Sequence, residues 1–92
     1  MPKEIVVDLI ARRPIKSVDG REIIAKSGTR VETTVSVGLD KVRGMEEVVA
    51  RDVLGVVGGS FEVRTVPTDG SPVRTGQAWI DHVIIAGARE RV

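Results

Sequence analysis

One stretch of the chain, residues 38–59, is the only part with the periodicity of a helix, and it constrains the fold most. Its apolar residues recur at steps of three and four, which places them on one helical face: Val42, Met45, Val49, Val53 and Val56. Glu46 and Glu47 suit a first turn, where the helix dipole favours negative charge. Gly55, Gly58 and Gly59 are typical stop signals. We therefore predict one amphipathic helix over about residues 40–57.

The rest of the chain has the composition of β-strands. It contains 17 Val and 8 Ile against 3 Leu, and β-branched residues favour a pleated sheet. Alternation predicts strands over residues 3–11, 29–37, 60–66 and 77–87, and Asp19-Gly20 predicts a hairpin turn between residues 15–18 and 21–26. A polar, frayed tail is expected from residue 88 onward.

These elements predict an α+β fold in a single domain of residues 1–92. We expect a mostly antiparallel sheet of about five strands with the helix packed on one face, in the order β-β-β-α-β-β. Residues 3–11 carry apolar side chains on both faces, so this strand should be central or covered on both sides.

Composition excludes several kinds of chemistry. There is no cysteine, so disulfides, thiolate nucleophiles and zinc thiolate sites are excluded. The net charge of +1 identifies neither a nucleic acid nor an acidic membrane as partner. Neither a signal peptide nor an apolar stretch of membrane-spanning length is present, and the expected location is cytoplasmic.

Catalytic and cofactor patterns are also missing. His82 is the one histidine, and its neighbour Asp81 points to the opposite face of a strand. None of Ser27, Ser60 and Ser71 lies in a nucleophile elbow that would make it a partner for His82. The glycines of residues 55–59 follow the helix, whereas a phosphate-binding loop precedes one. We expect no cofactor, no metal site and a non-enzymatic protein, although carboxylates such as Asp8 and Glu22 leave an enzyme open.

The connection over residues 66–76 is the best candidate for a binding loop. Two prolines make it rigid, and a rigid exposed loop loses little entropy when it binds. The candidate residues are Pro67, Asp69, Gly70, Ser71, Pro72, Val73, Arg74 and Thr75. The alternative reading is an ordinary strand connection stiffened by proline.

Part of this loop resembles a known family. Pro67 and then Gly70-Ser71-Pro72-Val73, between a helix and a strand, resemble the reactive-loop region of the potato inhibitor I family of serine-protease inhibitors. The resemblance covers less than half of the chain and implies a protease-inhibitor-like loop, with the scissile bond at Thr75-Gly76. The sequence departs from the family at Thr68-Asp69, which adds one residue before the glycine, and by the lack of supporting arginines in residues 77–82.

Basic residues gather in the first third of the chain, which gives a second binding hypothesis. Phosphate contacts from these side chains would support sequence-nonspecific nucleic-acid binding: Arg12, Arg13, Lys16, Arg21 and Arg30. Acidic residues lie among them, so a solvated sheet face is the simpler reading.

The main functional expectation is self-association. Adjacent pairs such as Ile23-Ile24 and Ile84-Ile85 put apolar side chains on both faces of a strand, and one helix covers only one face. An uncovered sheet face or edge then needs a partner, most simply a second copy of the chain. The candidate interface residues are Trp79, Ile80 and Ile84, and another protein as partner stays open.

Overall fold

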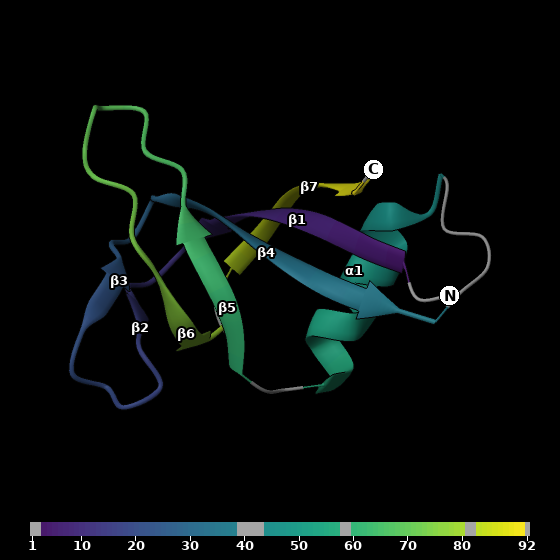
Figure 1. The fold of residues 1–92 in the computed structure, drawn as a ribbon, viewed down its shortest axis with the longest axis horizontal. Coiled ribbons are helices and arrows are strands. Elements are labelled where there is room, and N and C mark those ends of the chain that lie inside the picture. Colours follow the sequence, from purple (N-terminus) through teal and green to yellow (C-terminus); the bar gives the residue numbers. More distant parts are fainter. Residues whose placement is uncertain (1–2, 39–43, 58–59, 81–82, 92) are drawn as a thin grey trace.

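A computed structural model describes residues 3–38, 44–57, 60–80 and 83–91, with the backbone alone for residues 53–57. The first half contains strands β1 (Lys3–Ala11), β2 (Ile15–Lys16), β3 (Ile23–Ala25) and β4 (Arg30–Val37). Helix α1 (Glu46–Val57) follows, and then strands β5 (Ser60–Thr65), β6 (Thr75–Trp79) and β7 (Val83–Glu90). The predicted α+β class is confirmed (Figure 1).

The strands form a five-stranded sheet in the order β6-β5-β4-β1-β7, in which every neighbouring pair is antiparallel. β2 and β3 form a separate hairpin. Its turn contains Gly20 with a φ of 73°, as the Asp19-Gly20 signal predicts. β1 lies between β4 and β7, so the prediction of a central first strand is also confirmed.

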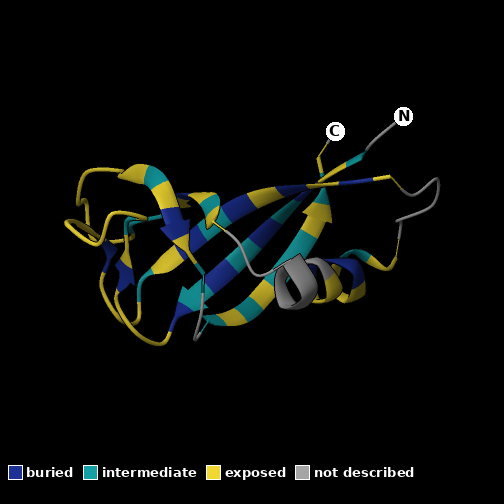
Figure 2. Cartoon of the chain, turned by 90° about the horizontal axis from the view of Figure 1, so that it is seen from below, coloured by how far each residue is buried: buried dark blue, intermediate teal, exposed yellow. Residues whose placement is uncertain are grey.

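Burial alternates from residue to residue along the central strands (Figure 2), so their side chains point to two different faces. One face, here called the covered face, carries the buried side chains of β1 and β4: Ile5, Val7, Leu9, Ala11, Val31, Thr33, Val35 and Val37. The opposite face, here called the open face, carries mostly polar residues of the same strands. Thr33 is the polar exception among these residues of β1 and β4, and its Oγ1 donates a hydrogen bond to the carbonyl of Glu62 at 2.8 Å.

Two elements cover the covered face at its opposite ends (Figure 1). Helix α1 packs against β7 and β1, with Val49 and Ala50 buried. The β2–β3 hairpin packs against β6 and buries Ile15 and Ile24. The helix therefore lies on one face of the sheet, as predicted, but it shares that face with the hairpin.

The helix begins later than its periodicity predicts. Gly44 has a φ of 86°, a left-handed conformation that ends a turn, and Glu46 is the first helical residue. The Gly44 N–H donates to Glu46 Oε1 at 3.1 Å, which fixes this start. Met45 consequently lies outside the helix and is 53% exposed, so its assignment to the buried face was wrong. Gly55 lies inside the helix, while Val42, Gly58 and Gly59 lie outside the described residues.

The single strand predicted over residues 77–87 is in fact two strands, β6 and β7, on opposite edges of the sheet. Trp79 and Val83 are four residues apart and so at most about 14 Å apart. The outer strands of a flat five-stranded sheet would lie about 19 Å apart. The sheet must therefore curl, and because Ile80 packs against the core, it curls toward the covered face.

The carboxyl-terminal tail is also more ordered than predicted. β7 continues to Glu90, and the Arg91 N–H donates to the carbonyl of Glu4 at 2.9 Å. Pairing with β1 accounts for this difference, because Ala88, Arg89 and Glu90 stand opposite Val7, Val6 and Ile5.

Candidate interaction surfaces

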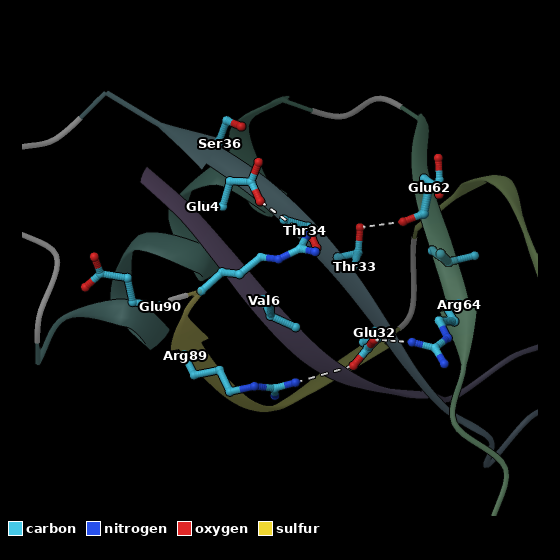
Figure 3. Close-up of a pocket in the computed structure, with 12 residues that line it drawn as sticks. Glu4, Val6, Glu32, Thr33, Thr34, Ser36, Glu62, Arg64, Arg89 and Glu90 are labelled. Atoms are coloured by element: carbon cyan, nitrogen blue, oxygen red, sulfur yellow. Dashed lines mark hydrogen bonds and ion pairs between the residues drawn. The ribbon is translucent and has the colours of Figure 1, made fainter. Parts of the chain in front are cut away.

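The open face carries a network of ion pairs between neighbouring strands (Figure 3). The Arg89 guanidinium lies 2.8 Å from Asp8 Oδ2 and 3.5 Å from Glu32 Oε2. Arg64 lies 3.5 Å from the other oxygen of Glu32, and Arg91 lies 3.3 Å from Glu4. The strand register causes this arrangement. Glu32 stands opposite Asp8 on one side and Arg64 on the other, so the Arg89 guanidinium is able to contact the carboxylates of both Asp8 and Glu32.

These ion pairs line an open groove of about 810 Å³. Its three arginines are paired with carboxylates of the same chain, and four glutamates line the groove, so it presents no excess of positive charge to a ligand. Their side chains are partly exposed, and exposed ion pairs contribute only about 0–1 kcal/mol each. Within the described ranges, no group of three or more His, Asp or Glu side chains is arranged to hold a metal ion.

The predicted binding loop forms one wall of a second groove. The connection over residues 66–74 faces residues 23–30 across a space of about 600 Å³. The Arg74 N–H donates to Thr65 Oγ1 at 2.8 Å, and the Arg74 guanidinium donates to the carbonyl of Ile23 at the same distance. Arg74 therefore ties the loop to β5 and to the hairpin, and its charge is not presented at the tip.

The tip of this loop is a local turn. Gly70 has a φ of 83°, and the Ser71 N–H donates to Asp69 Oδ1 at 3.0 Å. Hydrogen bonds from the Ser71 hydroxyl and then the Ser71 N–H lower the pKa of Asp69 below its ordinary value. Pro67, Asp69, Ser71, Pro72 and Arg74 line the groove. Val73 is 50% exposed, so the loop also presents an apolar side chain to solvent.

The bond that the inhibitor resemblance implies as scissile does not lie in the loop. Thr75 and Gly76 belong to β6, where they pair with Arg64 and Val63. A strand held on a ladder is not the extended, accessible segment that a protease cleaves. This geometry does not favour inhibition by these residues.

The predicted phosphate-contact residues are all exposed but are spread over several elements. Arg12 and Arg13 lie in the bend after β1, Lys16 in β2, and Arg21 beside the hairpin turn. Arg30 is the first residue of β4 and lines the loop groove. At the hairpin turn, the Ser17 hydroxyl and then the Arg21 N–H lower the pKa of Asp19, which puts an anion beside Arg21.

The predicted interface residues are likewise separated by the sheet. Trp79 is 51% exposed at the end of β6, opposite Ser60 on the open face. Ile84 is 48% exposed on β7, at the other edge of the sheet. Ile80 is partly buried against the core. His82 and Asp81 lie outside the described residues.

The free edge of β7 is the feature that sequence analysis did not locate. β7 pairs with β1 on one side, and no described strand pairs with its other side. The opposite edge of the sheet is protected differently, because Ser17 bridges to Ala78 and the Val18 N–H donates to the carbonyl of Gln77. The strand assignment was needed to find this edge, since the predicted strand over residues 77–87 merged two edges into one.

Comparisons with models of protein families, with curated proteins and with solved structures give no significant match. Among the described residues, no helix has the length and hydropathy to span a membrane.

Proposed function

We propose that this protein is a non-enzymatic assembly module that associates with a second copy of itself through the free edge of β7. The observation that carries the proposal is the incomplete burial of this strand. An unpaired edge presents a row of N–H and C=O groups that another strand can bind. β7 is eight residues long and contains no proline, so each of its residues carries a backbone N–H that is able to donate.

The inward-facing side chains of β7 support this role. Ile85 and Ala88 stand opposite Leu9 and Val7 on the covered face. Leu9 and Val7 are completely buried, whereas Ile85 and Ala88 are only partly buried. A strand added beyond β7 would remove this remaining apolar surface from water, which stabilises association by roughly 25 cal/mol per Å².

The edge is a better interface than the open face. The open face is crossed by ion pairs that are satisfied within one chain, and covering them would cost desolvation. The edge carries Ile84 and Ala86 exposed, with no charge before Arg89. In Figure 2 the strand begins at the lower margin of the molecule, and helix α1, which packs against β7, stands beside it toward the right.

Molar mass by light scattering, with and without added salt, tests the proposal. Wild type should give twice the chain mass of 9.9 kDa at both salt concentrations, because apolar contacts and backbone hydrogen bonds carry the interface. Ile84→Lys should be monomeric and folded. Val73→Lys, at an equally exposed apolar residue of the loop, is the matched control and should stay dimeric. A wild-type monomer at millimolar concentration would exclude the proposal.

Nucleic-acid binding and protease inhibition, as well as the cytoplasmic location, stay predictions from the sequence. The nucleic-acid hypothesis predicts affinity for DNA or RNA that falls steeply with salt and is independent of sequence. No specific distance or burial in the structure favours it over self-association.

A further inference from the structure

We infer the register of this assembly: two β7 strands pair antiparallel about a two-fold axis between Ile85 and Ala86, so that Ile84 of one chain packs against Gly87 of the other. The inference rests on the proposed function and deepens it, since it specifies which residues meet. In this register, Val83 stands opposite Ala88 and Ile85 stands opposite Ala86.

A β-bulge in β7 limits the registers that are available. Gly87 pairs with Asp8 and Ile85 pairs with Leu9, so one additional residue, Ala86, is inserted between them. A two-fold axis perpendicular to the sheet requires paired residues to lie on the same face. In a regular strand, residues three apart such as 84 and 87 point to opposite faces. Because the bulge inserts one residue, residues three apart on opposite sides of it point to the same face.

The pairing with β1 shows which residues share a face. Ile84 and Gly87 stand opposite Ile10 and Asp8, both on the open face. Val83 and Ala88 stand opposite Ala11 and Val7, both on the covered face. Registers centred on Ile84 or on Ala88 also match faces, but they overlap only residues 83–85 or 86–90 of β7. Among registers that pair residues before the bulge with residues after it, two satisfy this matching: one pairs Ile84 with Gly87, and the other pairs Ile84 with Arg89.

Side-chain chemistry selects between these two registers. β7 is apolar from Val83 to Ala88 and charged at Arg89 and Glu90. Pairing Ile84 with Arg89 would also set Val83 against Glu90, and each charge would lose water without gaining a partner. Pairing Ile84 with Gly87 keeps the six apolar residues 83–88 together and leaves the charged residues Arg89 and Glu90 outside the interface.

Gly87 leaves the space that this register needs. A Cβ built on Gly87 would meet only Asp8 Oδ2, at an ordinary contact distance of 3.9 Å. Gly87 does not have a positive φ, so its own fold does not require glycine there. The missing side chain is instead useful to a partner, because a half-exposed isoleucine on the same face can lie over it.

Disulfide crosslinking tests the register directly, because the chain contains no cysteine of its own. Ile84→Cys and Gly87→Cys chains would be mixed, allowed to exchange and oxidised. A directly opposed cross-strand pair has the Cβ separation that a disulfide needs, about 4–5 Å. The mixture should form a covalent dimer at least tenfold faster than either variant alone. A mixture of Ile84→Cys with Arg89→Cys is the matched control and should crosslink no faster than its components.

The outcomes separate the register from the assembly. Faster crosslinking of Ile84→Cys with Arg89→Cys would overturn the register and leave the edge interface standing. A wild-type dimer without a preferred crosslink from position 84 would also overturn the register. A wild-type monomer by light scattering would overturn both proposals.

Gly87→Val provides a measurement that does not depend on oxidation. A Cβ at this position makes only an ordinary contact within the chain, and valine favours strands, so the variant should keep its circular dichroism spectrum. The added side chain would fill the place of the partner's Ile84. A folded monomer is expected. A Gly87→Val dimer that dissociates no more readily than wild type would overturn the inference.

Discussion

At the scale of single residues, two aspartates hold the exposed turns through the same local geometry. Asp19 accepts hydrogen bonds from Ser17 and Arg21, and Asp69 accepts from Ser71. Each carboxylate binds groups that lie two residues away, the pattern by which Asp stabilises a turn before glycine. The hydrogen bonds favour the ionised form, which is why both pKa values lie below the ordinary 3.8.

These lowered pKa values predict a pH dependence with a definite sign. A carboxyl group whose pKa is lower in the folded chain stabilises the fold above its unfolded value of 3.8. That contribution should be lost as the pH falls below 3.8 through the folded value. Denaturant midpoints of wild type and of Asp19→Asn/Asp69→Asn, measured from about pH 7 to about pH 2, should converge only at the acidic end. A constant difference across this range would contradict the assignment.

Gly76 shows how a residue without a side chain lets the hairpin approach the sheet. A Cβ built on Gly76 would lie 2.9 Å from Ile24 Cδ1, closer than a real contact allows. Gly76→Ala should therefore lower the free energy of unfolding, by about 1 kcal/mol because Ile24 can shift only partly. In the Ile24→Val background, which lacks Cδ1, the same substitution should be neutral or stabilising. Equal effects in both backgrounds would show that this contact is not the cause.

At the scale of elements, the start of the helix depends on one backbone conformation. The left-handed conformation of Gly44 costs about 1–2 kcal/mol for an L-residue with a side chain. Gly44→Ala should lower the free energy of unfolding by about this amount. Gly38→Ala is the control, since Gly38 has no positive φ and an open surrounding, and it should have little effect. Equal losses in thermal or denaturant melts would mean that the conformation of Gly44 does not set the helix start.

Some strands are identified by the alternation of apolar and polar residues in the sequence, and others only by the strand that they pair with in the sheet. β1 and β4 are buried on one face and wet on the other, so their period of two is visible in the sequence. β6 ends at Trp79 and β7 begins at Val83, and the sequence Ile80-Asp81-His82 between them contains no glycine or proline that would mark a turn. The chain leaves one edge and reaches the other because the sheet curls, and this curl is a property of the whole sheet.

At the scale of the whole molecule, the curled sheet leaves the two edges in different situations. The β6 edge is bridged by Ser17 and Val18 of the same chain, whereas the described residues leave the β7 edge unpaired. The net charge of +1 provides little repulsion between copies, so association through β7 is not opposed electrostatically. The salt-independent mass expected of the dimer follows from this balance.

The sequence by itself determined the fold class, the central strand over residues 3–11, the hairpin at Asp19-Gly20 and the rigid connection after β5. These features are local, because they depend on periodicity and on the turn chemistry of a few adjacent residues. It also identified Ile84 as exposed apolar surface worth testing. The predicted α+β order was correct in outline, with the helix placed between the two groups of strands.

Only the tertiary structure decided the start of the helix, the division of β6 from β7, the ion pairs of the open face and the unpaired edge. The helix start depends on the backbone conformation of Gly44. The other three features depend on partners far away in the chain: Glu32 meets Arg64 and Arg89, and β7 lies beside β1, across the sheet from β6. Periodicity reports which face of a strand is buried, but it carries no information about which strand lies next to it. The free edge is defined by the lack of a neighbouring strand beyond β7 among the described residues, and for that reason only the assembled sheet reveals it.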